Sequence, residues 1–282
     1  MVTLKNDILS VKISELGAEI KSIVKDEYEY IWQGDPQIWA GSAPILFPLC
    51  GASKDGKYIL DGKEYNIPQH GFAKFKTFEV ESVTDTKAVF LLKEDDETLS
   101  MFPFKFEFRA IFTLKKNAIK TEYKVKNLTN DTMYFSVGSH EALVVPEGIE
   151  DYDIIFPKKE TLESMLVNGP LIQKHKMLIA KNTNVLPMYD KYFLLDTLIF
   201  GGLNSKSAIL KNRKTERAVK IDFPDADYFL IWHKPSAPYI CLEPWSGMAD
   251  REDSDYDITK RDSIISLGFN KEYTNTHTVT IF

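Results

Sequence analysis

The strongest constraint in this sequence is a strict alternation of apolar and charged residues. In Phe104-Lys105-Phe106-Glu107-Phe108-Arg109, three aromatic rings alternate with three charged side chains. Because successive side chains of a β-strand point to opposite faces, this pattern predicts a strand with one buried face and one solvated face. The same alternation recurs from end to end of the chain, in Val11-Lys12-Ile13, Tyr123-Lys124-Val125-Lys126, Val219-Lys220-Ile221-Asp222-Phe223 and Val279-Thr280-Ile281. The chain is therefore expected to be rich in half-buried strands.

Turn chemistry supports antiparallel pairing of these strands. Residues 58–60 and 63–65 flank Asp61-Gly62, a dipeptide that suits a two-residue hairpin turn with positive φ. Residues 127–131 predict a further turn between strands at 123–126 and 133–137. No stretch of a dozen residues carries a capped helical stripe, and short helices are possible only near 36–39 and 190–194. We expect one all-β domain spanning residues 1–282, a large antiparallel β-sandwich with a few short helices.

Charge and the start of the chain narrow the classes of partner and compartment. The 282 residues carry a formal net charge of −6, and no segment gathers basic and aromatic side chains as a nucleic-acid groove does. The first residues lack a basic region followed by an apolar one, and no run is apolar enough to span a membrane. The expectation is a cytoplasmic protein without nucleic-acid or membrane partners.

Cysteine usage and known local motifs exclude several enzyme classes. Cys50 and Cys241 are far apart and each lies among apolar residues, which predicts buried reduced thiols and neither a disulfide nor a metal site. The acidic segment 250–257 lacks the central glycine and terminal glutamate of a calcium-binding loop, so a solvated loop is expected. Motifs of serine hydrolases, nucleotide kinases and zinc enzymes are not found in the sequence.

Two histidines lie in segments that would hold an imidazole at a cleft. His70 follows Pro68, which stiffens the chain, and precedes Gly71, which permits an unusual backbone angle. His140 comes after Gly138, where another group can approach the backbone closely. The alternative for each is an exposed histidine in a turn or at a strand end. His175 is expected in a solvated loop and His277 in the polar approach, at 274–278, to the last strand, and His233 either lines a cleft or ends a strand.

The most informative carboxylate is Glu243, which stands in the apolar run Tyr239-Ile240-Cys241-Leu242-Glu243-Pro244-Trp245. Burying a carboxylate there is costly unless it has a role or a partner. Alternation places Glu243 on the face of Cys241 and Tyr239, Pro244 is expected to end ladder pairing, and Trp245 can form an apolar wall against a sugar ring. The alternative is a structural ion pair. Asp196 is a second acid in an apolar run, although turn and cap roles are common for aspartate.

Three ordered segments resemble the aldose 1-epimerase (galactose mutarotase-like) superfamily, with spacing closest to its LacX-like branch. They are 46–51 running on to Gln69-His70-Gly71-Phe72-Ala73, then Phe135-Ser136-Val137-Gly138-Ser139-His140, and then Cys241-Leu242-Glu243-Pro244-Trp245. The resemblance covers nearly the whole chain and implies the large antiparallel β-sandwich that alternation also predicts.

What the resemblance implies is a cofactor-free, metal-free interconversion of the α and β anomers of a free hexose such as galactose or glucose. Glu243 would be the general base at the C1 hydroxyl and His140 the general acid at the ring oxygen. His70 would hold the ring-oxygen side of the sugar, Asp196 would accept hydrogen bonds from its hydroxyls, and Trp245 would line the site. The protein would act as a monomer or homodimer on a small sugar.

The sequence departs from the family pattern at positions that concern the substrate. Ala52 stands where family members often carry an arginine, so a sugar contact is lost or passed to Lys54. Glu141-Ala142-Leu143 replaces a common proline and aromatic after the second histidine. Two alternatives therefore stay open. One is a phosphorylated or otherwise anionic hexose met by Lys54, Lys74 or Arg213, and the other is a sugar-binding protein without turnover.

Overall fold

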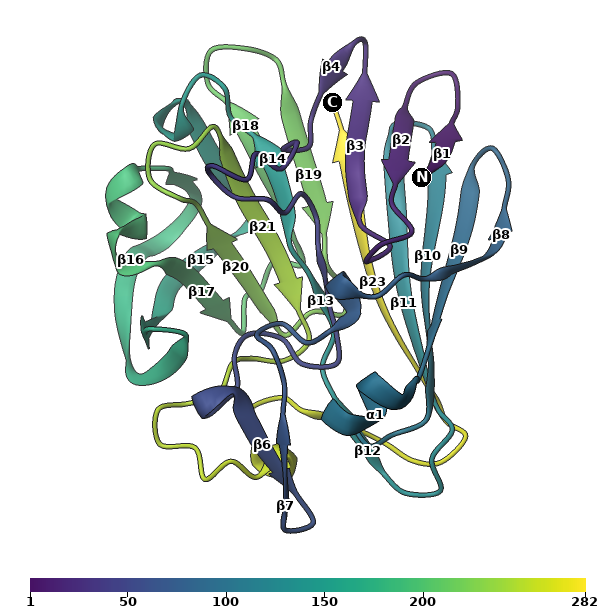
Figure 1. Cartoon of the computed structure of the whole chain (residues 1–282). Coiled ribbons are helices and arrows are strands. Elements are labelled where there is room, and N and C mark those ends of the chain that lie inside the picture. The colour runs from purple at the N-terminus through teal and green to yellow at the C-terminus, as the bar shows by residue number, and fades with distance from the viewer.

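The computed structural model describes residues 1–282, apart from the side chain of Leu195, and shows a large antiparallel sheet (Figure 1). The sheet runs in the order β5 (Ile45–Leu46), β13 (Gly138–Ser139), β21 (Tyr239–Trp245), β20 (Tyr228–Trp232), β17 (Thr197–Gly201), β15 (Tyr152–Asn168), β18 (Ser207–Asn212), β19 (Ala218–Asp222), β23 (Glu272–Ile281), β11 (Ala118–Asn127), β10 (Phe106–Lys115), β9 (Lys87–Lys93) and β8 (Glu79–Val83). Off this path, β14 (Glu141–Val144) pairs with β21 and β16 (Leu171–Pro187) pairs with β15. The predicted all-β sandwich fold is confirmed.

A second, four-stranded sheet packs against one half of the large one. It consists of β1 (Val2–Lys5), β2 (Ser10–Ile13), β3 (Ile20–Lys25) and β4 (Tyr28–Glu29), shown in purple in Figure 1. Its inward residues Val11 and Ile23 share one buried core with Phe108 and Val125 of the large sheet. The apolar positions of the alternating segments thus fill the space between two sheets, as a sandwich requires.

Strand β10 confirms the alternation that most constrained the fold. Phe106 and Phe108 are fully buried, while Glu107 and Arg109 are partly exposed and form an ion pair with an N–O distance of 2.8 Å. The strand begins at Phe106 and not at Phe104, although Phe104 is also buried.

Smaller elements complete the molecule. They are the hairpin of β6 (Lys57–Leu60) and β7 (Lys63–Asn66), the pair β12 (Met133–Phe135) and β22 (Ile265–Leu267), the helix α1 (Asp96–Met101), and the 3₁₀ turns η1 (Lys54–Gly56), η2 (Ala73–Phe75), η3 (Ile149–Asp151), η4 (Asp190–Leu195) and η5 (Ile258–Lys260). The Asp61-Gly62 turn is confirmed, with φ of 50° and 76°. A short helix is present at 190–195, as expected, whereas residues 36–39 form a turn.

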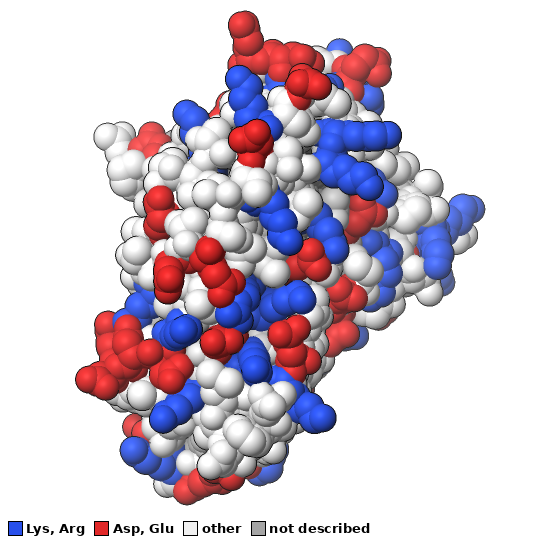
Figure 2. Space-filling view, turned by 90° about the vertical axis from the view of Figure 1, so that its right-hand side faces the viewer, with Lys and Arg blue, Asp and Glu red and all other residues white. Residues whose placement is uncertain are grey.

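Two structural features bear on partners. Basic and acidic side chains are interspersed on the face seen in Figure 2 and do not separate by sign. Within the described residues, no helix has the length and apolar character needed to cross a membrane.

Candidate active site

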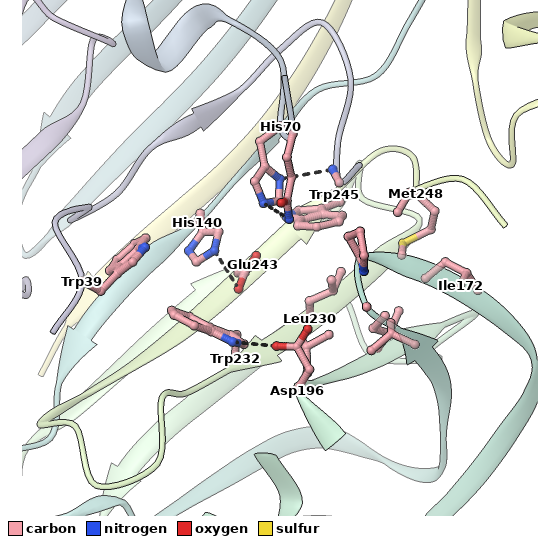
Figure 3. Close-up of a pocket in the computed structure, with 18 of the residues that line it drawn as sticks. Trp39, His70, His140, Ile172, Asp196, Leu230, Trp232, Glu243, Trp245 and Met248 are labelled. Atoms are coloured by element: carbon pink, nitrogen blue, oxygen red, sulfur yellow. Dashed lines mark hydrogen bonds and ion pairs between the residues drawn. The ribbon is translucent and has the colours of Figure 1, made fainter. Parts of the chain in front are cut away.

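The sheet places His140 and Glu243 directly opposite each other. Gly138 faces Trp245 and Glu141 faces Leu242 across the pairing with β21, so the same antiparallel register puts position 140 opposite position 243. His140 lies in the one-residue break between β13 and β14. Its Nε2 atom is 3.3 Å from Oε1 of Glu243 (Figure 3). Two residues a hundred positions apart thus form one buried acid–base pair.

Aromatic rings exclude water from this pair. The Trp39 ring stacks on the His140 imidazole at a centroid distance of 5.0 Å, and the Trp232 ring meets it edge-on at 5.7 Å. The His140 side chain is 10% exposed and that of Glu243 is 2% exposed. Because both side chains are largely removed from water, the charged form of each is destabilised by desolvation.

Burial moves the two pKa values in opposite directions. It lowers the pKa of His140 to about 4, against a smaller opposing effect of the Glu141 carboxylate. Burial, followed by the carboxylates of Glu141 and Asp196, raises the pKa of Glu243 well above its ordinary value. In the free cavity, burial therefore disfavours the state with an ionised Glu243 and a protonated His140. The pair instead holds one proton as an uncharged imidazole and carboxylic acid, and behaves as a coupled unit.

His70 approaches the pair from a loop that glycines make possible. Gly71 has φ of 72°, and a Cβ atom there would lie 2.2 Å from the carbonyl oxygen of Phe47. The Gly51 amide donates to Nδ1 of His70 at 3.2 Å, and the His70 amide donates to the Gly51 carbonyl at 2.7 Å. The His70 ring stands perpendicular to that of His140 with centroids 5.9 Å apart. Burial, with the nearby His140 and Lys74, lowers its pKa, so the ring is neutral with its proton on Nε2.

A buried arginine holds the loop that carries Gly51. Arg261 donates hydrogen bonds to the carbonyls of Cys50, Ala52 and Met248 and to Oγ of Ser53, and pairs with Asp250 at 3.1 Å. The arginine does not line the cavity. It stabilises the loop from behind and does not replace the family arginine at position 52.

Asp196 closes another side of the site. It follows η4 with φ of 84° and ψ of −89°, and its Oδ1 accepts a hydrogen bond from Nε1 of Trp232 at 3.0 Å. Burial raises its pKa. Only Oδ1 is used in this hydrogen bond, so Oδ2 can accept hydrogen bonds from a ligand in the cavity.

These groups surround a cavity of about 360 Å³, within the usual range for small-ligand sites of roughly 300–1,000 Å³. All five residues predicted for the site line it, namely His70, His140, Asp196, Glu243 and Trp245. Figure 3 shows His70, His140 and Glu243 clustered on one side and Asp196 with Leu230 on the other. An aromatic and aliphatic wall with a few convergent polar groups suits the apolar face and hydroxyls of a pyranose.

Sequence reasoning missed two parts of the wall. Trp39 comes from a turn after Pro36 and carries no local signal of a site. Val167, Gly169, Pro170 and Ile172 come from the tip of the long β15–β16 hairpin, which the sequence pattern did not predict. Gly169-Pro170 was a turn signal that would have located the hairpin tip, but not its return to the cavity.

The cations considered for an anionic substrate are separated by the structure. Lys74 lines the cavity, whereas Lys54 donates to the Ser254 carbonyl and Arg213 pairs with Asp153 on another part of the surface. Of the two outcomes expected for the missing arginine contact, its loss or its transfer to Lys54, the placement of Lys54 outside the cavity favours loss.

The remaining histidines lie outside the cavity. His175 is exposed, but in β16 and not in a loop. His277 is fully buried, with Nε2 2.6 Å from Oε1 of Glu141, and it lies inside β23, so its expected place in a segment leading up to the last strand is wrong. His233 ends β20 and is buried.

Two other expectations from the sequence meet different outcomes. Pro244 does not end the ladder, because β21 continues to Trp245 and Pro244 stands opposite Phe229. The acidic segment at 250–257 is matched by basic partners, for example Asp253 with Lys174 at 2.8 Å, but its first residue, Asp250, is buried and not solvated.

One group of described residues has the spacing of metal ligands. His140, Cys241 and Glu243 each offer one ligand atom, and these atoms lie within 4.8 Å of one another. Both cysteines are free and buried, as predicted. Burial raises the pKa of the Cys241 thiol well above its ordinary value, so it is protonated and a metal would have to displace that proton.

The chain is similar to known proteins over nearly its full length. The family model "Aldose 1-epimerase" matches residues 1–250. The plasmid and chromosomal LacX proteins of Lactococcus lactis subsp. lactis are each 34% identical over 263 residues, covering 88% of both chains.

Two solved structures share the fold closely. The galactose mutarotase related enzyme of Lactobacillus acidophilus is 33% identical with a TM-score of 0.95, covering 100% of this chain and 97% of that one. A galactose mutarotase-like protein of Lactobacillus casei is 29% identical with a TM-score of 0.94, covering all of both chains. The resemblance inferred from three short motifs is confirmed, and the chain belongs to the aldose 1-epimerase family.

Proposed function

We propose that the protein interconverts the α and β anomers of a free hexose such as galactose or glucose, without a cofactor. The observation that carries this proposal is the His140–Glu243 pair, with Nε2 and Oε1 3.3 Å apart in a dry cavity. Anomerisation needs one group to remove the proton of the C1 hydroxyl and another to protonate the ring oxygen. A pair that holds one proton between an acid and a base meets this need in a single site.

Glu243 is proposed as the base at the C1 hydroxyl and His140 as the acid at the ring oxygen. As the C1 O–H bond breaks, its electrons form the carbonyl, the C1–O5 bond breaks, and O5 takes the proton from the imidazole. Rotation about C1–C2 turns the other carbonyl face toward O5, and the two groups exchange roles as the ring closes. Sugar binding must first shift the shared proton onto His140, which the hydroxyl and ring oxygen favour by replacing lost solvation.

The other cavity residues are proposed to orient the sugar. His70 presents its Nε2 proton on the side of the ring oxygen, and Asp196 accepts hydrogen bonds from hydroxyls. The rings of Trp39 and Trp245 cover the apolar C–H face of the pyranose.

Polarimetry or proton NMR on pure α-galactose and α-glucose tests the proposal. We expect the protein to accelerate equilibration and the variants Glu243→Gln and His140→Asn to lose the acceleration by about 10²-fold or more. Matched controls are Glu79→Gln and His175→Asn, which make the same changes at exposed positions. Wild-type rates in both cavity variants would contradict the assignment, and saturable sugar binding without acceleration would favour a sugar-binding protein.

Lys74 favours an anionic hexose as a second candidate substrate. The side chain is half-buried at the cavity, and this burial lowers its pKa. Among the residues that the structure describes, no carboxylate lies within ion-pair distance of it. A substrate phosphate or carboxylate would supply that partner. The second candidate predicts a lower KM for hexose 6-phosphate or hexuronate than for the neutral sugar, and loss of this preference in Lys74→Met.

A further inference from the structure

His233 is a buried histidine that the proposed chemistry does not use. It is 1% exposed and does not line the cavity. Its Nδ1 atom lies 2.6 Å from the Tyr239 carbonyl oxygen, and its Nε2 atom lies 2.7 Å from Oδ1 of Asp190. Each ring nitrogen thus lies within hydrogen-bond distance of an oxygen atom from a different part of the chain. Such an arrangement fixes the ring tightly between two parts of the chain.

Those two parts are the strand β21, which carries Glu243, and the turn η4, which is followed by Asp196. Tyr239 is the first residue of β21, which carries Glu243. Asp190 is the first residue of η4, and Asp196 follows the last. The ring of Phe193, in the middle of η4, also meets the His233 ring edge-on at 5.3 Å. His233 therefore contacts the turn at its start and at its middle.

The other end of the turn is held by the preceding residue of β20. Nε1 of Trp232 donates to Oδ1 of Asp196 at 3.0 Å. The last residue of β20 and the residue after it thus bind the two ends of η4, with Trp232 at Asp196 and His233 at Asp190. We name this pair of contacts the η4 clasp.

Asp196 needs such support because its backbone is strained. Its φ of 84° with ψ of −89° lies outside the regions that L-residues occupy freely. Residues in such conformations persist only where the surroundings over-determine them. A 3₁₀ turn of six residues has poor hydrogen-bond geometry of its own and supplies little of that support. The two contacts of the η4 clasp supply that support instead.

We propose that His233 is a positioning residue, which acts through Asp190 and η4 to hold the Asp196 carboxylate at the sugar hydroxyls. This inference rests on the proposed function, because it gives Asp196 its substrate. It assigns a role to a residue pair outside the cavity.

The variant Asp190→Ala tests the clasp, since the Asp190 side chain is 40% exposed and its removal takes away the partner of Nε2 of His233. We expect KM for the sugar to rise roughly 10-fold while kcat changes less than about 2-fold, because the acid–base pair is untouched. Asp190→Asn, which keeps an acceptor oxygen for Nε2 of His233, should recover most of the affinity. Asp7→Ala, at an exposed position, is the control.

Non-additivity separates positioning from a general loss of structure. In an Asp196→Asn background, Asp190→Ala should add less than about 2-fold to KM, because the carboxylate that it positions is already absent. An unchanged KM in Asp190→Ala, or a full additional 10-fold effect in the double variant, would overturn the proposal.

A readout without substrate keeps the clasp testable if no sugar is turned over. The chain has four tryptophans, so the indole N–H region of a ¹H–¹⁵N spectrum is simple, and Trp232→Phe assigns the signal of interest. Asp190→Ala should shift the Trp232 indole signal in the direction that Asp196→Asn shifts it, while leaving the other three in place. An unmoved Trp232 signal would refute the clasp, whereas an inactive wild-type protein with the expected shift would refute only the proposed function.

Discussion

Nε2 of His140 lies 3.3 Å from Oε1 of Glu243, in a setting where burial favours the uncharged form of both. The neutral pair and the charge-separated pair contain the same single proton. Moving from one to the other therefore needs no exchange with solvent, only a change in the site's polarity. Under the proposed function, a bound sugar would make that change by bringing a hydroxyl and a ring oxygen to the two groups, which would couple substrate binding to activation of the base.

The one-proton pair predicts a bell-shaped dependence of kcat/KM on pH. Below about pH 4, His140 becomes protonated while Glu243 keeps its proton, so the pair holds two protons and contains no base. Above the raised pKa of Glu243 the pair loses its only proton and no acid remains. We expect the acid limb near pH 4 and an alkaline limb well above the ordinary glutamate value, measured by polarimetry with spontaneous mutarotation subtracted at each pH. A rate independent of pH from 3 to 10 would contradict the shared-proton pair.

Replacing Trp39 should move the acid limb. The Trp39 ring covers the His140 imidazole at a centroid distance of 5.0 Å and helps to keep water away. In Trp39→Leu, water reaches His140, and its pKa should rise from about 4 toward its ordinary value of 6.5. The acid limb of kcat/KM then moves to higher pH, and KM rises because one wall of the cavity is lost.

Trp32→Leu provides the control for this experiment. Trp32 packs on Tyr239 at a centroid distance of 5.1 Å, donates a hydrogen bond from Nε1 to the Trp39 carbonyl at 2.8 Å, and does not line the cavity, so its variant loses a contact of the Trp39 backbone but keeps the Trp39 ring. Its loss should lower stability while leaving the acid limb in place. An acid limb that stays near pH 4 in Trp39→Leu would show that Trp39 does not set the solvation of His140.

Glu243 should reduce stability at neutral pH, as active-site groups often do. Its folded-state pKa is raised, so between about pH 4.5 and that pKa the folded state holds a proton that the unfolded state has released. Stability therefore falls as pH rises through this window. Glu243→Gln removes the effect, and we expect its free energy of unfolding to exceed that of the wild type by an amount that grows with pH.

Urea unfolding at a series of pH values measures this difference. His140 contributes with the opposite sign, since its folded pKa is depressed and the unfolded state binds more protons between about pH 4 and 6.5. Because His140 is coupled to Glu243, the two proteins are compared above about pH 6.5, where the His140 contribution no longer changes with pH. A difference between the two proteins that does not change with pH would mean that Glu243 is not desolvated as described.

Local patterns predicted the strands whose signals are local. The alternating rings of Phe106 and Phe108 indicated a strand with one buried face. The dipeptide Asp61-Gly62 predicted its turn because both residues adopt positive φ. The β15–β16 hairpin was missed because its strands carry runs such as Gln173-Lys174-His175-Lys176, which are polar on both faces. An exposed ribbon that packs few residues into the core leaves little hydrophobic periodicity to read.

The site was predictable only where an unusual residue met an apolar run. Glu243 was conspicuous for that reason, and the ordered motifs joined it to His70 and His140. The protonation state was not predictable, because it depends on Trp39 and Trp232, whose rings contact the His140 imidazole from distant parts of the chain. Neither tryptophan carries a local sign of that contact.

Removal of metal ions should leave the activity unchanged. An acid–base mechanism uses His140 and Glu243 directly, yet these two residues and Cys241 also have the spacing of a metal site. After dialysis against EDTA we expect kcat within about 2-fold of the untreated value, and Cys241→Ser should behave in the same way. Added Zn²⁺ competes for the same two groups, so it should inhibit the wild type more strongly than Cys241→Ser, which lacks the thiolate ligand. Loss of activity on EDTA treatment, restored by one metal ion, would instead make that ion part of the reaction and remove Glu243 from its role as base.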